Sequence, residues 1–298
     1  MLGLLALTCT GAAYADETIT FVHQGIDRPL ILHHPPALPP GPAPLVIALQ
    51  GLGQDTESLK RALRLDATAD RAGFRVLYPE AFAHAWSYGR PINQPMPKIG
   101  EATIDDVGLV RRVIDDFVER RIADPAHIYV TGMSRGGLMA YTLACALADR
   151  IAAAAPLISG MTEYQREDCR PARAMPIMVV AGTADRTQSF DGGQGLVGRL
   201  LSVPDTLDYW ATLHGCTAST AHALPHRDPA DPTSVTLIDW TGCREGGRVR
   251  LYRVEGGGHR IPTLVPERSP EDVKPIVLRN RDIETAEEIW AFFKDLSR

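Results

Sequence analysis

Three side chains of this sequence could together activate a hydroxyl group for attack on an acyl carbon: Ser134, Asp185 and His259. A serine hydroxyl is a weak nucleophile at neutral pH, so it needs a neighbouring base, and histidine is the side chain that serves most often. A carboxylate on the other ring nitrogen would hold the imidazole in the required tautomer and stabilise its protonated form. The chain therefore contains the residue types for nucleophilic catalysis, provided that its fold brings them together.

Ser134 lies in the pentapeptide Gly132-Met133-Ser134-Arg135-Gly136, between an apolar run at residues 127–131 and a helix-like segment at residues 137–144. A Gly-x-Ser-x-Gly pattern between a strand and a helix is typical of a nucleophile elbow, a tight turn that exposes the serine at the edge of a sheet. Glycines flank the serine because side chains there would collide within the turn. We expect the Arg135 N–H, at the start of the helix, to help bind an oxyanion.

Asp185 and His259 each follow a predicted strand, at residues 176–181 and 249–254. The carboxyl ends of parallel strands meet at one edge of a sheet, which makes Asp185 the leading candidate for the acid. Asp191 is its nearest rival, and an ordinary Asx turn is the alternative interpretation. Three glycines precede His259 and leave the backbone free to present the imidazole at that edge.

A second oxyanion donor is expected in the loop that follows residues 45–49, an apolar run of the kind found in buried parallel strands. We expect the Leu52 N–H to complete the oxyanion hole and Gly51 to lie beside the substrate, although an ordinary glycine turn fits the loop equally well. Trp86 lies in the long aperiodic stretch 80–100. Such a loop is usually functional, so Trp86 is expected either to line the substrate pocket or to anchor the loop.

Strand-like and helix-like segments alternate along the chain, which predicts one α/β domain with a mostly parallel central sheet flanked by helices. The order Ser134, Asp185, His259 is that of the α/β-hydrolase triad, so we expect a single α/β-hydrolase domain over residues 16–298. The proline-rich residues 35–44 are expected to form an extended surface connection. The expected strands are residues 19–23, 28–33, 45–49, 74–78, 127–131, 152–158, 176–181 and 249–254. The expected helices are residues 55–72, 104–121, 137–144, 204–214 and 284–296.

The overall charge of the chain and its first residues bear on location and partners. The net charge is −5 over 298 residues with no basic run, so neither nucleic acid nor an anionic membrane surface is an expected partner. Residues 1–15 combine a short apolar run with the sequence Ala13-Tyr14-Ala15, which predicts a signal peptide and secretion to the periplasm or outside the cell. The basic stretch that normally precedes such a run is missing, which is compatible with a start upstream of Met1. A buried N-terminal strand or helix is the alternative, and the run is too short to span a membrane.

Removal of residues 1–15 would leave four cysteines: Cys145, Cys169, Cys216 and Cys243. An even number in an exported protein suggests two disulfides, of which three pairings are conceivable. We favour Cys145–Cys169 and Cys216–Cys243 because these pairs do not cross, while four free thiols are the alternative. The Cys and His spacing of a zinc site is absent, and neither a metal nor a cofactor is expected.

Taken together, these motifs give the chain a resemblance to the polyhydroxybutyrate depolymerase-like esterases, which include type-D feruloyl esterases and LpqC-like lipoproteins. The resemblance runs from about residue 45 to the C-terminus. The matching segments are residues 51–54, Trp86 with residues 89–90, and residues 105–107, 132–137, 139–141, 182–185, 191–193, 256–259 and 287–293. The resemblance implies a secreted serine ester hydrolase that works without a metal, through an acyl-enzyme. It implies polyhydroxybutyrate-type (oligo)esters or feruloyl and cinnamoyl esters as substrates, and it supports the Cys216–Cys243 pair.

The chain departs from the pattern of that family at three places. Gln50 replaces the usual histidine, residues 188–190 replace Val-Pro-Tyr, and Arg135 replaces a common asparagine. Arg135 would place a cation beside the nucleophile and favour substrates that carry a carboxylate, unless it points to solvent. A peptidase of the same fold and a non-catalytic binding protein are the alternative functions. The first would need a cap or propeller segment that the sequence lacks, and the second would normally have lost a triad residue.

Overall fold

The computed structural model describes residues 16–89, 98–99, 102–195, 198–244, 246–265 and 278–298, so the predicted signal peptide lies outside the described residues. A central ten-stranded sheet has the order β1-β2-β4-β3-β7-β8-β9-β14-β13-β12. Its strands are β1 (Glu17–His23), β2 (Ile26–His33), β3 (Ala43–Leu49), β4 (Arg75–Pro79), β7 (Ala123–Met133), β8 (Ala153–Leu157), β9 (Ile177–Gly182), β12 (Ala218–Ala223), β13 (Ser234–Thr241) and β14 (Val249–Glu255). The strands from β4 to β14 run parallel to one another, and the outer strands pair antiparallel.

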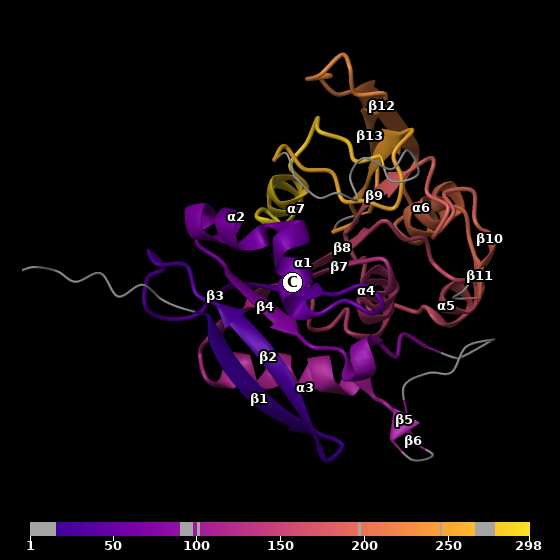
Figure 1. Ribbon diagram of the computed structural model, residues 1–298. Helices are drawn as coiled ribbons and strands as arrows, with labels where there is room; N and C mark the ends of the chain where they lie inside the picture. The colour runs from indigo at the N-terminus through magenta and orange to yellow at the C-terminus, as the bar shows by residue number, and fades with distance from the viewer. Residues whose placement is uncertain (1–15, 90–97, 100–101, 196–197, 245, 266–277) are drawn as a thin grey trace, which may run out of the picture.

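Helices cover both faces of this sheet (Figure 1). The described helices are α1 (Thr56–Leu63), α2 (Leu65–Ala72), the short 3₁₀ helix η1 (Phe82–His84), α3 (Asp106–Glu119), α4 (Arg135–Ala146), α5 (Glu163–Asp168), α6 (Val203–Leu213) and α7 (Thr285–Phe293). One apolar core joins the sheet to α3, α4 and α6, and a second joins it to α1, α2 and α7. Two small hairpins, β5 (Lys98–Ile99) with β6 (Ala102–Thr103) and β10 (Gly193–Gly195) with β11 (Gly198–Leu200), lie outside the sheet. The prediction of an α/β fold with a mostly parallel central sheet is confirmed.

The expected helix at residues 55–72 is instead two helices, because Arg64 adopts a left-handed conformation with φ 56° and ψ 28°. Its N–H still bonds the carbonyl oxygen of Lys60 and closes α1. Leu63 and Leu65 are both fully buried. Residues two apart face different sides of one helix, so a continuous helix could not bury both. The break resolves that conflict.

The prediction that strands and helices alternate to the end of the chain was wrong, because β12, β13 and β14 follow one another without a helix between them. All six residues of β12 are exposed at the edge of the sheet, so its sequence carries no apolar alternation to detect. The helix α5 was also missed, since six residues are too few to show helical periodicity.

Two disulfides each tie the end of a helix, or the residues just beyond it, to another segment. Cys145 in α4 is bonded to Cys169, the residue after α5, and Cys216 is bonded to Cys243. These are the two pairs that the sequence favours. Within the described residues, no helix combines the length and the apolar character needed to cross a bilayer.

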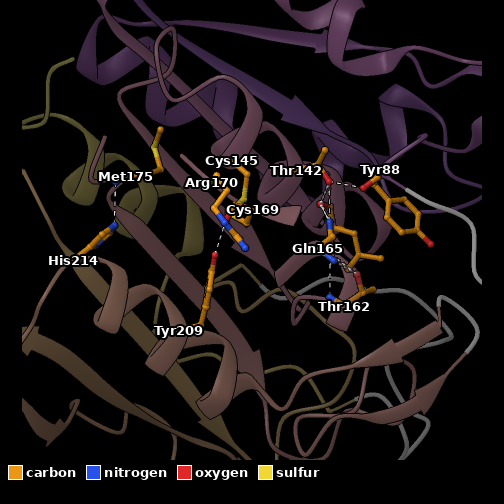
Figure 2. The surroundings of a disulfide bond; sticks show 11 residues. Tyr88, Thr142, Cys145, Thr162, Gln165, Cys169, Arg170, Met175, Tyr209 and His214 are labelled. Atoms are coloured by element: carbon orange, nitrogen blue, oxygen red, sulfur yellow. Dashed lines mark hydrogen bonds between the residues drawn. A yellow bond between two sulfur atoms is a disulfide. The ribbon is translucent and has the colours of Figure 1, made fainter. Parts of the chain in front are cut away.

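His214 makes the stability of the folded protein depend on pH. The side chain is 1% exposed, its Nε2 accepts a hydrogen bond of 3.0 Å from the Met175 N–H (Figure 2), and burial, aided by Arg244 and Arg173, lowers its pKa to about 4. Between pH 6.5 and 4, His214 therefore binds a proton in the unfolded chain but not in the folded protein. The free energy of unfolding consequently falls as the pH falls through this window.

We expect the unfolding free energy of the wild type to drop by about 2 kcal/mol more than that of His214→Gln between about pH 7.5 and about pH 5. Urea denaturation of both proteins at the two pH values measures the difference. If the difference in unfolding free energy between the two proteins did not change with pH, His214 would not be the source of the pH dependence.

Candidate active site

Ser134 connects β7 to α4 in a conformation that non-glycine residues rarely adopt, with φ 56° and ψ −116°. The N–H of Ser134 donates to the Leu157 carbonyl oxygen at 2.9 Å, which ties the turn to the neighbouring strand. A Cβ atom on Gly132 would lie 2.4 Å from the Gly136 carbonyl oxygen, and one on Gly136 would lie 2.1 Å from that of Leu49. Both glycines are therefore required by close backbone approaches. Backbone strain of this kind is often found at functional sites, where the surrounding structure maintains it.

His259 and Asp185 lie in direct contact, with 2.6 Å between His259 Nδ1 and Asp185 Oδ2. The Asp185 carboxylate is buried, and its other oxygen accepts the N–H groups of Thr187 at 2.7 Å and Gln188 at 3.0 Å. Because Nδ1 is directed at the carboxylate, Nε2 is the ring nitrogen left to exchange a proton. The rival acid, Asp191, is exposed and makes no described contact with His259.

The segment that carries His259 packs tightly against the end of β9. The Ala184 N–H donates to the Gly257 carbonyl oxygen at 2.9 Å, and the Gly256 N–H donates to Thr183 Oγ1 at 2.9 Å. A Cβ on Gly182 would lie only 2.2 Å from the Gly257 oxygen. The glycines at the ends of β9 and β14 thus allow the acid and the histidine to meet, since β9 and β14 are parallel neighbours.

The loop after β3 lies against Ser134, since a Cβ on Gly51 would be 3.5 Å from Ser134 Cβ. Hydrogen bonds within the protein occupy three of its N–H groups: Gly51 donates to Gln54 Oε1, Gly53 to the His84 oxygen and Gln54 to the Gly51 oxygen. In the described part of the chain the Leu52 N–H has no such partner. Arg135 is the first residue of α4, so its N–H also lacks an intrahelical acceptor. These two N–H groups are the expected oxyanion donors.

Hydrogen bonds of Gln50 and Trp86 anchor this loop to the rest of the protein. Gln50 is 1% exposed, and its Nε2 donates to the Gln54 carbonyl oxygen at 2.9 Å. The carbonyl oxygen of Gln50 accepts the indole N–H of Trp86 at 3.0 Å. Trp86 is itself 1% exposed, so its position favours the anchoring role over that of a wall of the substrate pocket. No pattern in the sequence predicts the bond between Gln50 and Trp86, because these residues lie far apart in the chain.

We expect Trp86→Phe to lower the unfolding free energy by about 1–2 kcal/mol, because the Gln50 carbonyl oxygen would be left buried without its donor. The same loss should loosen the loop after β3, which carries the expected oxyanion donor Leu52, and reduce kcat about tenfold. Ester hydrolysis and thermal unfolding measure the two effects, with Trp240→Phe on β13 as the matched control for losing an indole elsewhere. An unchanged kcat would mean that the loop does not depend on this bond.

Arg135 is also buried, at 4% exposure, with its guanidinium carbon 5.1 Å from the centre of the Tyr88 ring. The alternative that its side chain points to solvent is therefore wrong. The loop carrying Tyr88 is fixed by Asp106, whose carboxylate accepts the Ser87 N–H and a guanidinium N–H of Arg28, both at 2.7 Å. Burial raises the pKa of Asp106, and Arg28 opposes that rise.

One group of described residues brings three possible metal ligands within 4.8 Å of one another: Asp16, His33 and Asp66. The Lys60 ammonium contacts both carboxylates of this group, at 3.0 Å in the case of Asp66. Burial opposes protonation of Lys60, yet the two carboxylates raise its pKa overall, so a protein cation already neutralises them. None of these residues belongs to the candidate active site.

The chain is similar to known esterases. The family described as "Esterase PHB depolymerase" matches residues 30–198. The chain is 31% identical over 267 residues to the protein named "Putative esterase NocK" of Nocardia uniformis subsp. tsuyamanensis, covering 83% of this chain and 75% of that protein. It is 32% identical over 162 residues to feruloyl esterase B of Piromyces equi, covering 52% of this chain but only 29% of that protein.

Solved structures support the fold. An acetyl xylan esterase from Aspergillus awamori superposes with a TM-score of 0.59 at 14% identity, covering 87% of this chain and 97% of that chain. A thermostable esterase superposes with a TM-score of 0.60 at 18% identity, covering 95% of this chain and 63% of that chain. At these identities the likeness concerns the fold alone.

Proposed function

Because the chain belongs to the esterase PHB depolymerase family and is a carboxylic-ester hydrolase, we propose that Ser134, Asp185 and His259 form its catalytic triad. The observation that carries the proposal is the 2.6 Å contact between His259 Nδ1 and Asp185 Oδ2, at the sheet edge where the strained elbow presents Ser134. This arrangement has the parts that acyl transfer requires: a nucleophile, a base and a group that orients the base.

In the first half of the reaction, Ser134 Oγ attacks the ester carbonyl carbon as His259 Nε2 takes the hydroxyl proton. The carbonyl oxygen becomes an oxyanion, which accepts hydrogen bonds from the N–H groups of Leu52 and Arg135. The C–O bond to the alcohol then breaks, the alcohol leaves with the proton from His259, and an acyl group remains on Ser134. Asp185 stays ionised throughout and stabilises the imidazolium.

In the second half, a water molecule gives a proton to His259 Nε2 and adds its oxygen to the acyl carbon. The bond to Ser134 Oγ breaks, the serine recovers its proton from His259, and the carboxylic acid is released. The cycle consumes one ester and one water and yields one acid and one alcohol. Apart from the ester and the water, every step uses only residues of the chain.

Two families of substrate fit this proposal: polyhydroxybutyrate-type (oligo)esters, and feruloyl or cinnamoyl esters. The names of relatives support both, since one is feruloyl esterase B and another is poly(3-hydroxyalkanoate) depolymerase C of Paucimonas lemoignei, 30% identical over 127 residues. The second match covers 43% of this chain and 30% of that protein. The two disulfides support a secreted enzyme, because disulfides persist in oxidising compartments.

Hydrolysis of p-nitrophenyl butyrate, with and without prior treatment by a fluorophosphonate, tests the serine mechanism. We expect turnover that the inhibitor abolishes, and rates that resist the inhibitor would overturn the proposal. Hydroxybutyrate trimer, methyl ferulate and a peptide p-nitroanilide then separate the substrate classes. Cleavage of the anilide alone would favour a peptidase, and binding of the esters without turnover would favour a non-catalytic protein.

A further inference from the structure

The guanidinium of Arg135 lies buried one residue after the nucleophile and has no counter-ion among the described residues. Its Nε and Nη2 atoms are buried and have no hydrogen-bond partner. Arg28, which is buried even more deeply, also has two nitrogens without a hydrogen-bond partner, Nε and Nη1, but its Nη2 lies 2.7 Å from the Asp106 carboxylate. A buried charge without a partner is costly, and an arginine cannot escape that cost by losing its proton. Within the part of the chain that the structure describes, Arg135 is therefore a buried cation without an anionic partner.

The two tyrosines near Arg135 do not supply this charge. The side chains of Tyr88 and Tyr164 are hydrogen-bonded to each other, and Tyr88 also contacts Arg135. Burial raises the pKa of both phenols, and Arg135 only partly opposes that rise. Both hydroxyls are therefore neutral at physiological pH. The guanidinium of Arg135 packs over the ring of Tyr88, but neither tyrosine supplies the negative charge that would neutralise it.

Tyr88 is held in place, so the guanidinium above it has a defined position. The Tyr88 carbonyl oxygen accepts the Thr142 hydroxyl at 2.5 Å. Gln165 Nε2 in turn donates to Thr142 Oγ1 at 2.8 Å and to the Leu138 carbonyl oxygen at 2.7 Å. Figure 2 shows this chain of contacts beside the Cys145–Cys169 disulfide. Binding groups that are fixed in advance lose little entropy when a ligand arrives.

The same residues border a cavity of about 650 Å³, lined by Tyr88, Tyr164, Gln165 and the Cys145–Cys169 disulfide among others. Arg135 is not one of the residues that line this cavity. The Arg135 side chain instead extends from the first residue of α4, whose Cα atom lies about 3.8 Å from that of Ser134. An anion bound by this guanidinium would therefore lie within the length of one arginine side chain from the backbone of the Ser134 turn.

The two donors without partners identify the kind of anion. Nε and Nη2 lie on one edge of the guanidinium and, once an entering substrate displaces the groups that cover them, can bond both oxygens of a carboxylate side by side. Arg250 of this protein does so with Asp239, at 2.6 Å from Nε to Oδ1 and 2.8 Å from Nη2 to Oδ2. Arg135 offers the same pair of donors, and no carboxylate of the described residues bonds to them.

We propose that the Arg135 side chain binds a free carboxylate of the substrate, so that the preferred esters carry a carboxylate within a few bonds of the scissile carbonyl group. This inference rests on the proposed function and narrows its substrate class. A 3-hydroxy acid esterified through its hydroxyl has its carboxylate one methylene from the carbon that bears the ester oxygen. The last ester bond of an acid-terminated hydroxyacid oligomer therefore fits. An interior bond of a long polymer and a feruloyl ester of a sugar do not.

The test compares kcat/KM for the 3-hydroxybutyrate dimer, which ends in a free carboxylate, with that for its methyl ester. We expect the wild type to prefer the free acid by about 10- to 100-fold, the worth of hydrogen bonds to a charged group. In Arg135→Gln this ratio should fall to near one, mainly through KM of the acid. Arg199→Gln is the matched control, because Arg199 is an exposed arginine on β11 that pairs with Glu163 at 2.9 Å. It should keep the wild-type ratio.

A second measurement needs no variant. The product 3-hydroxybutyrate should inhibit hydrolysis of p-nitrophenyl butyrate by the wild type more strongly than its methyl ester does. Equal rates on both dimers in the wild type, or equal losses on both in Arg135→Gln, would overturn the inference while leaving the esterase mechanism intact. Turnover of p-nitrophenyl butyrate but of neither dimer would also overturn it. Failure to hydrolyse any ester would instead refute the proposed function.

Discussion

Replacement of Ser134 by alanine is expected to lower kcat by about 10⁶-fold, because the change removes the hydroxyl oxygen that the proposed mechanism uses to form the acyl-enzyme. The elbow itself should persist. Its geometry is imposed by the close approaches of Gly132 and Gly136 and by the bond from the Ser134 N–H to the Leu157 oxygen, none of which involves the hydroxyl. Initial rates on p-nitrophenyl butyrate measure the loss, and circular dichroism with a thermal melt checks the fold.

Ser219→Ala is a suitable control for Ser134→Ala, because Ser219 is exposed on the edge strand β12. That variant should hydrolyse the ester at the wild-type rate. Retention of more than about 1% of the wild-type kcat in Ser134→Ala would mean that another group attacks the ester, since loss of a triad nucleophile costs orders of magnitude more.

Asp185→Asn is expected to lower kcat by about 10⁴-fold with little change in the fold. The Asp185 Oδ1 atom accepts two backbone N–H groups, from Thr187 and Gln188. An asparagine would keep its carbonyl oxygen there and turn its amide nitrogen toward His259. The amide would donate to Nδ1, so that the imidazole proton would move to Nε2. The imidazole could then no longer accept the Ser134 proton.

The matched control for the acid is Asp191→Asn, since Asp191 is the other candidate that the sequence offers and lies exposed. It should retain wild-type kcat. The reverse result, with activity lost in Asp191→Asn and kept in Asp185→Asn, would show that the orienting carboxylate had been assigned to the wrong residue. Measuring kcat at saturating substrate separates this effect from any change in binding.

Features with local causes could be predicted from the sequence. The elbow is a short sequence pattern, and its glycines are required by close approaches of the backbone within a few residues and on the adjacent strand. The strand and helix that flank it have clear hydrophobic periodicity. The prediction that Asp185 and His259 share one sheet edge used only the rule that parallel strands end together. The structure pairs the two side chains, with β9 and β14 as parallel neighbours.

Features that depend on distant partners could not be predicted. Trp86 can be a pocket wall or an anchor, and only its bond to the Gln50 carbonyl oxygen decides between them. The break at Arg64 follows from the burial of both Leu63 and Leu65, which is a property of the packed protein. The sequence shows a cation after the nucleophile, but the isolation of the Arg135 guanidinium depends on the absence of a carboxylate partner among the described residues.

The most direct test of the triad is the mass of the acyl-enzyme. Rapid acid quenching of the wild type with p-nitrophenyl butyrate, followed by peptide mapping, should find a butyryl group on the peptide that contains Ser134. The group should be absent from Ser134→Ala treated in the same way. A butyryl group on another residue, or turnover of the ester by Ser134→Ala at the wild-type rate, would contradict the account.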